Sequence, residues 1–170
     1  MKNWKEHDPD YAGEKERHES PLPSRRFLLK TLTAHAGPLT AAEQQQFDRG
    51  REVYRNICAG CHQPDGRGLD RLAPSLVGSP FTLAPAEIPI RILMNGKEGA
   101  TGLMPPVGGA LDDEQIASVL TYVRREWGQT ADPVDATAVT AVRVASAGRT
   151  RPWTGAELAA LPGGRGGRRE

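Results

Sequence analysis

The stretch Cys58-Ala59-Gly60-Cys61-His62 contains both cysteines of the chain, and a histidine follows the second one directly. The pattern C-x-x-C-H is typical of covalent attachment of a c-type haem. Two thiols three positions apart in one turn can each form a thioether with one of the two vinyl groups of a single porphyrin. The imidazole of His62 is then held against one face of the porphyrin, where it can bind the iron. The motif therefore predicts one covalently bound haem c.

Other uses of the two cysteines fit the sequence less well. A disulfide across two intervening residues would close a strained small loop and leave His62 without a role. A thioredoxin-like redox pair occurs at the start of a helix within a β-α-β pattern, and no such alternation is visible. A zinc site needs four ligands, and the other histidines, His7, His18 and His35, all lie in a polar N-terminal stretch. Haem is the preferred interpretation.

Length and composition limit what the chain can build. One ordinary domain with extensions fits in 170 residues, and the net charge of +1 gives no argument for binding nucleic acid. Only 38% of the residues are hydrophobic, so a large flat cofactor would supply part of the core. No apolar run approaches the roughly 20 residues of a membrane helix, and no transmembrane segment is expected.

Residues 1–39 are expected to be a charged leader or linker with little order, because charges are dense and little repeats at helical spacing. Within them, residues 24–30 are similar to a twin-arginine export motif, but polar residues and Pro38 interrupt the apolar segment that a signal needs. Haem is attached to such motifs outside the bacterial cytoplasm. We therefore expect a periplasmic protein without a convincing export signal here, either the C-terminal part of a longer exported polypeptide or a chain with a misassigned start.

A helix is expected over residues 40–57, directly before and into the motif. It begins with a capping box, in which the Thr40 hydroxyl accepts from the backbone N–H of Glu43 and the Glu43 carboxylate reaches back. One face, at helical spacing, carries Phe47, Gly50, Tyr54 and Ile57. Because glycine costs stability in the middle of a helix, another backbone is expected to approach closely at Gly50.

A second capped helix is expected over residues 113–127, with Asp112 as its N-cap, Gln115 at the third position and Gly128 as its C-terminal stop. Its apolar face is formed by Ile116, Val119, Leu120 and Val123, with Trp127 near the end.

The remaining segments give weaker signals. A short helix over residues 85–95 is expected to kink or start late at Pro89, and glycines indicate a loop over 96–110. An Ala/Val-rich segment over 132–147 and a capping box over 154–157 predict short helices near the C-terminus.

A haem iron bound by His62 needs a ligand on its other face, and a thioether there raises the reduction potential and closes the iron to other ligands. The candidates are Met94 and Met104. Met94 falls in the expected short helix, where a methionine most often fills the core. Met104 falls in the glycine-rich loop, and Pro105 and Pro106 stiffen the backbone after it. Met104 is therefore the preferred second ligand.

The second ring nitrogen of a ligating histidine also needs a partner, usually a carboxylate or a backbone carbonyl. Pro74 follows His62 by twelve residues, where its carbonyl could accept from the Nδ1–H of His62. This bond would fix the ring and raise its basicity as a ligand.

In combination, these features resemble class I monohaem cytochrome c over about residues 40–128. The resemblance implies an all-α fold with covalently bound haem, to which this chain adds a helical C-terminal extension. It also implies that the first and last helices cross near Gly50 and Tyr54, with Tyr54 packed against the face at 120–123.

Carried onto the matching positions, the resemblance implies a role for each site residue. Cys58 and Cys61 bind the haem covalently, and His62 and Met104 are the axial ligands of its iron. The carbonyl of Pro74 accepts the hydrogen bond from His62. Such a site transfers electrons and has no substrate chemistry of its own, so no catalytic residue is expected.

Three segments are expected: a leader or linker over 1–39, a cytochrome domain over 40–128, and an extension over 129–170 with short helices and a disordered Gly/Arg end. The extension is similar to those on cytochrome domains fused to periplasmic sugar or alcohol dehydrogenases, where the cytochrome accepts electrons. The implied partners are a dehydrogenase as donor and an oxidase or another cytochrome as acceptor.

Two alternatives stay open. One is a haem peroxidase-like or ligand-sensing protein in which Met104 moves away, although the sequence offers no distal acid or base beside Met104. The other is a docking role of residues 129–161 on a larger dehydrogenase, which is compatible with electron transfer.

Overall fold

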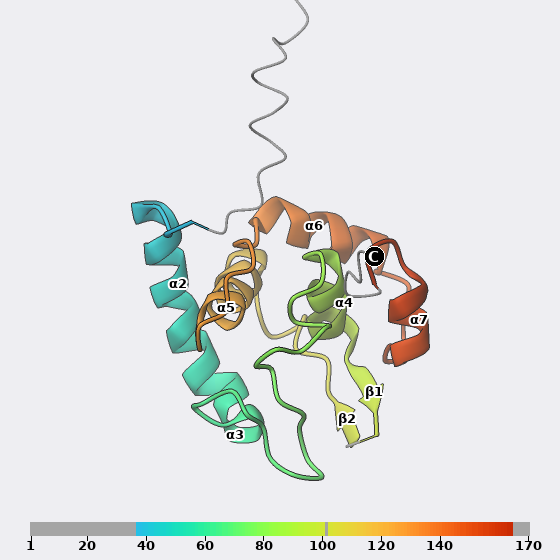
Figure 1. Ribbon diagram of the computed structural model, residues 1–170. Helices are drawn as coiled ribbons and strands as arrows, with labels where there is room; N and C mark the ends of the chain where they lie inside the picture. Colours follow the sequence, from blue (N-terminus) through green and yellow to red (C-terminus); the bar gives the residue numbers. More distant parts are fainter. Residues whose placement is uncertain (1–36, 101, 165–170) are drawn as a thin grey trace, which may run out of the picture. The chain divides into compact units, whose positions relative to one another are not determined.

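The computed structural model describes residues 37–100 and 102–164, which form mainly helices (Figure 1). The elements are α2 (Ala41–Val53), the π-helical turn η1 (Tyr54–Cys58), α3 (Ala59–His62), α4 (Glu87–Asn95), β1 (Lys97–Gly99), β2 (Gly102–Met104), α5 (Asp113–Arg125), α6 (Ala136–Ala145) and α7 (Gly155–Ala160). The predicted all-α fold is confirmed apart from one small hairpin. The twin-arginine-like segment and the Gly/Arg end lie outside the described residues.

The hairpin of β1 and β2 is antiparallel and replaces part of the loop predicted over residues 96–110. It pairs Lys97 with Met104 and Gly99 with Gly102. Strands of three residues with glycine at the turn show no alternation of apolar and polar side chains, so the sequence carries no strand signal here.

The two long helices, α2 and α5, are in backbone contact, as the sequence predicts. A Cβ atom on Gly50 would overlap the carbonyl oxygen of Ser118 and lie 2.9 Å from the Cβ of Tyr122. Beside this contact the rings of Tyr54 and Tyr122 lie 5.2 Å apart, and Tyr54 packs in one cluster with Val123. The capping boxes at Thr40 and Asp112 are both present.

The prediction that Ile57 lies on the buried face of this helix is wrong. Residues Tyr54–Cys58 form a π turn, after which the N–H of Ala59 donates to the carbonyl of Tyr54, five residues earlier. A π turn contains more residues than an α turn, so the side chains after Tyr54 point in other directions around the helix axis than a regular α-helix would give them. Ile57 is consequently 43% exposed, whereas Cys58 packs against the cluster of Tyr54.

Helix α5 is shorter than predicted and is buried on more than one face. It ends at Arg125, and the next turn is made by Trp127 and Gly128, whose φ angles are 55° and 79°. Trp127 therefore leaves the helix, and its ring lies over Gly66, where a Cβ would be 2.6 Å from the indole.

Helix α4 starts late, as expected from its proline. Pro89 is the third helical residue, a position whose N–H needs no partner within the helix. The helix stops at Gly96, where the φ angle is 77°.

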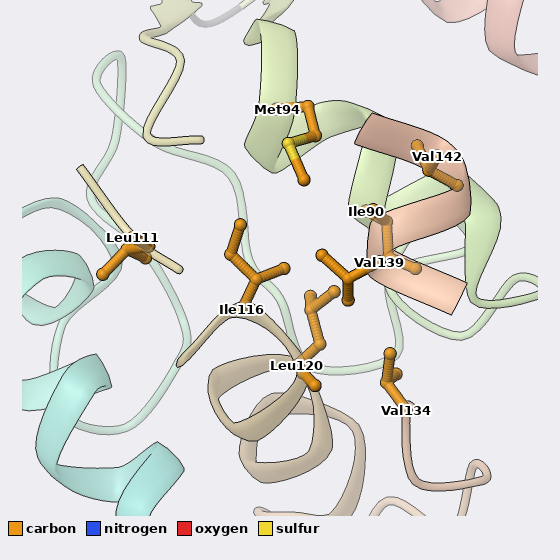
Figure 2. Close-up of a cluster of buried hydrophobic side chains, with 9 residues drawn as sticks. Ile90, Met94, Leu111, Ile116, Leu120, Val134, Val139 and Val142 are labelled. Carbon is orange, nitrogen blue, oxygen red and sulfur yellow. The ribbon is translucent and has the colours of Figure 1, made fainter. Parts of the chain in front are cut away.

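Helix α6 lies within the predicted Ala/Val-rich segment and has Asp135 as its N-cap. Helix α7 begins at the predicted capping box of Thr154. Helix α6 packs against α4 and α5, and Figure 2 shows the side chains that meet between them. This cluster includes Ile90 and Met94 of α4, Ile116 and Leu120 of α5, Val139 and Val142 of α6, and Leu111 and Val134 from the loops. Residues 129–164, here called the C-terminal segment, therefore share a hydrophobic core with the rest of the fold.

At Gly50, adding a single methyl group should lower the stability of the protein. We expect Gly50→Ala to destabilise the protein by about 3 kcal/mol, since the Cβ meets backbone and cannot be relieved by a rotamer change. Gly148→Ala is the control, because nothing lies within 4 Å of a Cβ there. Urea denaturation of both variants measures the difference, and equal stabilities would contradict the close crossing.

Candidate haem-binding site

A cavity of about 460 Å³ lies between the segment after α3, the β1–β2 hairpin and α5. Its lining includes all five site residues that the sequence predicts: Cys58, Cys61, His62, Pro74 and Met104. These residues come from three separate segments of the chain. Most of the remaining wall is apolar, with Tyr54, Phe81, Ile92, Leu103, Val119 and Leu120 among its residues.

The π turn places the motif at the cavity. Tyr54 begins the turn, lines the cavity and is 1% exposed. Its hydroxyl donates to the carbonyl oxygen of Gln63 at 2.6 Å, which ties the turn to the end of α3. The motif is thus held at both ends, with Cys58 at the π turn and His62 at the end of α3. Sequence reasoning missed this bond, since a tyrosine on an apolar face indicates only packing.

Neither cysteine forms a disulfide, and both line the same cavity. Burial raises the pKa of the Cys58 thiol to about 11, and the neighbouring Cys61 adds to the shift. A thioredoxin-like pair needs a lowered thiol pKa, so the environment of Cys58 argues against that use. Within the described ranges, no three histidine, cysteine or acidic side chains gather as a metal-ion site would require.

His62 is 7% exposed, and its Nδ1 lies 3.1 Å from the carbonyl oxygen of Pro74. A carbonyl can only accept, so Nδ1 carries the proton and the lone pair is on Nε2. Burial lowers the pKa of His62, and the hydrogen bond to Pro74 opposes part of that shift. The imidazole is therefore neutral at pH 7, the form that binds a metal.

The loop between His62 and Pro74 has a backbone geometry that requires glycine. The N–H of Gly68 donates to the carbonyl oxygen of His62 at 2.9 Å. Gly68 has a φ of 79°, and a Cβ there would lie 2.7 Å from the carbonyl oxygen of Pro74. The chain can therefore turn back tightly enough to bring this carbonyl to the His62 ring.

Met104 and Met94 are in different environments. Met104 ends β2, is partly buried and lines the cavity. Met94 is 9% exposed and lies in the core cluster of α4, α5 and α6 (Figure 2). Its sulfur packs over Gly108. Of these two residues, Met104 belongs to the cavity lining and Met94 does not.

A buried arginine supports one wall of the cavity. Arg124 is 4% exposed and donates to the carbonyl oxygens of Thr82 and Ala84, at 2.7 and 2.6 Å, and of Asp132, at 2.9 Å. Burial lowers its pKa. Sequence reasoning missed this role, because an arginine in the last turn of a helix is typical of an exposed residue that complements the helix dipole.

The residues present fit a c-type haem. The volume falls within the range of small cofactor sites, and the wall is mainly apolar, as a porphyrin requires. The lining provides two thiols, one imidazole with a free lone pair, and one thioether. Imidazole and thioether are the ligand pair of His/Met cytochromes.

Comparisons with known proteins agree with this geometry. A family model described as cytochrome C oxidase, cbb3-type, subunit III, matches residues 45–123. The cytochrome c-554(548) of Halomonas halodenitrificans is 35% identical over 65 residues, which are 38% of this chain and 78% of that protein.

Larger relatives are subunits of dehydrogenases. The fructose dehydrogenase cytochrome subunit of Gluconobacter japonicus is 39% identical over 106 residues, covering 55% of this chain and 22% of the relative. The cytochrome c subunit of the quinone alcohol dehydrogenase of Gluconobacter oxydans is 29% identical over 116 residues, covering 60% and 23%. The matched part is less than a quarter of the length of these two subunits.

The chain belongs to the cytochrome c family. As a member of this family it carries covalently bound haem c.

Both thiols are expected to be consumed by the attachment. Intact mass of the matured protein should equal the polypeptide plus one haem, and iodoacetamide should label neither Cys58 nor Cys61 after denaturation. The same chain made without the haem-attachment machinery is the control and should be labelled at both. A matured protein without haem mass and with two reactive thiols would contradict the assignment.

Proposed function

We propose that His62 and Met104 would bind the iron of the haem and that the protein passes single electrons between a periplasmic dehydrogenase and a further acceptor. The observation that carries the proposal is the cavity itself, whose lining includes both thiols of the motif, the neutral imidazole and one methionine sulfur. Cys58 and Cys61 would hold the haem covalently.

Bound haem would supply a one-electron couple, and a thioether ligand from Met104 together with the imidazole of His62 would raise its reduction potential. The chain supplies orientation and exclusion of water. Pro74 holds the His62 ring and fixes its tautomer through the 3.1 Å contact. Apolar side chains such as Ile92 and Leu120 keep the interior of the cavity dry.

The composition of the lining favours electron transfer over a peroxidase-like activity. In the part of the chain that the structure describes, no carboxylate and no second histidine line the cavity. General acid–base catalysis most often uses one of these groups within hydrogen-bond reach of the substrate. The lining does include Tyr54 and Lys97, but the Tyr54 hydroxyl donates to the carbonyl of Gln63 and the Lys97 ammonium donates to the carbonyl of Glu98. We therefore propose that the protein performs no substrate chemistry of its own.

The partners and the organisation of the chain are part of the proposal. The relatives named as cytochrome subunits of fructose and alcohol dehydrogenases support a fused or partner dehydrogenase as electron donor. Covalent haem attachment supports a periplasmic location. In the described part of the chain, no helix is long and apolar enough to span a bilayer. We propose a leader or linker over 1–39, a cytochrome domain over 40–128 and an extension over 129–170.

The ligand assignment is tested with the two methionines. Met104→Ala should keep covalent haem but lose the thioether-to-ferric-iron charge-transfer band, lower the reduction potential and bind carbon monoxide rapidly when reduced. Met94→Ala is the control: it should keep the band and lose about 2–5 kcal/mol of stability, as buried methionines do. Loss of the band in Met94→Ala alone would reverse the assignment.

The donor is tested by stopped-flow spectroscopy. Quinone alcohol dehydrogenase and fructose dehydrogenase, each stripped of its own cytochrome subunit and reduced with its substrate, should reduce the ferric protein at a rate that saturates with protein concentration. Samples without dehydrogenase set the background rate. Reduction no faster than background with both enzymes would argue against a dehydrogenase donor of this kind.

A further inference from the structure

Strand β1 is paired on both of its edges. On one edge Lys97 lies opposite Met104 of β2. On the other edge the N–H of Trp153 donates to the carbonyl of Gly96 at 3.0 Å, and the N–H of Glu98 donates to the carbonyl of Trp153 at 2.8 Å. The C-terminal segment thus adds a third strand position to the hairpin that carries Met104. Because an isolated two-stranded hairpin is marginally stable at best, this pairing bears directly on where Met104 is held.

The side chain of Trp153 also belongs to the apolar cluster against which Met104 packs. It is 9% exposed and forms a cluster with Ile88, Ile92 and Leu158, and Met104 packs against this cluster. Two members of the cluster, Trp153 and Leu158, come from the C-terminal segment. The surface that supports the Met104 side chain therefore comes partly from outside the region that resembles a minimal cytochrome c.

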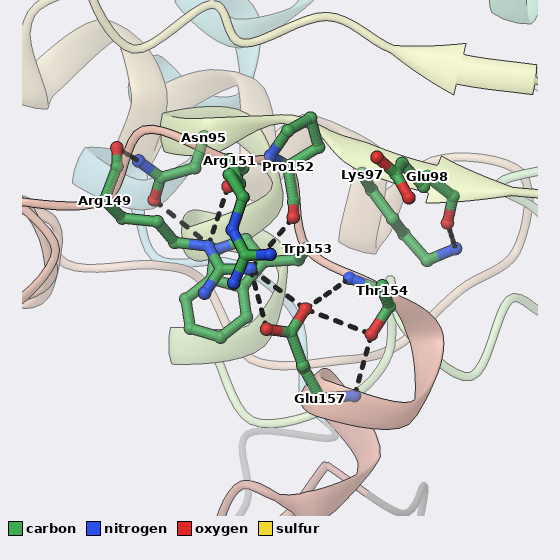
Figure 3. A network of polar contacts seen from close by, with 9 residues as sticks. All are labelled: Asn95, Lys97, Glu98, Arg149, Arg151, Pro152, Trp153, Thr154 and Glu157. Atoms are coloured by element: carbon green, nitrogen blue, oxygen red, sulfur yellow. Dashed lines mark hydrogen bonds and ion pairs between the residues drawn. The ribbon is translucent and has the colours of Figure 1, made fainter.

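A polar network fixes the orientation of the indole (Figure 3). The Nε1 of Trp153 donates to Oδ1 of Asn95 at 3.3 Å, and the guanidinium of Arg149 lies 3.5 Å from the ring centroid. Both carboxylate oxygens of Glu157 accept from Arg149, at 2.9 and 3.0 Å. The Arg149 side chain is 19% exposed and that of Glu157 is 37% exposed, so solvent screens this pair in part. Stacking and hydrogen bonding together leave the indole few alternative positions.

We propose that Trp153, Arg149 and Glu157, here called the Trp153 clamp, position the β1–β2 hairpin and thereby keep the Met104 sulfur at the cavity. The inference rests on the proposed role of Met104 as an axial ligand. A ligand held in few conformations competes better with exogenous ligands than one on a mobile hairpin, because less ordering entropy is lost when it binds. The C-terminal segment is thus a positioning element of the site.

The test uses full-length ferric protein with haem attached and two readouts. Trp153→Ala should increase the affinity for imidazole about tenfold, equivalent to about 1.4 kcal/mol, and weaken the thioether charge-transfer band. Amide hydrogen exchange over residues 97–104 should become at least about tenfold faster, in keeping with local opening. Glu157→Gln keeps a side-chain oxygen that can accept from the backbone N–H of Thr154 but removes the negative charge that pairs with Arg149. It should shift both readouts in the same direction, about threefold.

Val142→Ala is the matched control, because Val142 is buried in the C-terminal segment but lies in the cluster of α4, α5 and α6. It should lower stability without changing imidazole affinity or exchange in the hairpin. If Trp153→Ala fails to accumulate, Trp153→Phe, which loses only the bond to Asn95 and part of the ring, and Glu157→Gln decide the question.

The outcomes separate the two proposals. If the wild-type protein lacks the charge-transfer band, Met104 is not a ligand and both proposals fall. If the band is present but the clamp variants bind imidazole like the wild type, or no more tightly than Val142→Ala does, the clamp is overturned and the ligation stands.

Discussion

The backbone contact of α2 with α5 at Gly50 is the constraint on which the rest of the structure depends. With no side chain on Gly50, α2 comes within van der Waals distance of Ser118 and Tyr122. Helix α2 continues through the π turn into the haem motif, and α5 supplies part of the cavity wall, including Val119 and Leu120. The crossing therefore sets how far the thiols lie from that wall. A larger residue at Gly50 would change the width of the site as well as the stability of the fold.

Burial favours the neutral form of two different groups at the site, His62 and Cys58. Water is largely excluded by the apolar wall, and the charged form of each group is disfavoured. The pKa of His62 is lowered and that of Cys58 is raised for this reason. The result is a neutral imidazole, which keeps a lone pair for a metal, and a thiol that is a poor nucleophile for disulfide exchange. The environment that suits a porphyrin thus disfavours the main alternative use of the cysteines.

The segment after residue 128 is more than an attachment to the cytochrome fold. It contributes Val134, Val139 and Val142 to one apolar cluster and Trp153 and Leu158 to another. The first cluster supports α4 and α5, and the second supports the hairpin of Met104. Removal of this segment would expose both. In the proposed organisation of the chain, the extension is therefore part of the core that surrounds the site.

The sequence by itself determined the local features. The C-x-x-C-H motif, the capping boxes at Thr40, Asp112 and Thr154, and the stop of α4 at Gly96 depend on chemistry within a few residues, which a linear pattern records. Three features were decided only by tertiary structure: the π turn that exposes Ile57, the burial of Arg124, and the pairing of Trp153 with β1. The last two depend directly on groups far away in the chain, such as the carbonyls that Arg124 binds 40 and 42 residues away. The π turn begins at Tyr54, whose ring packs against that of Tyr122 in α5. Spacing along the sequence carries no record of such partners, because the free energy that selects them arises only when separate segments pack together.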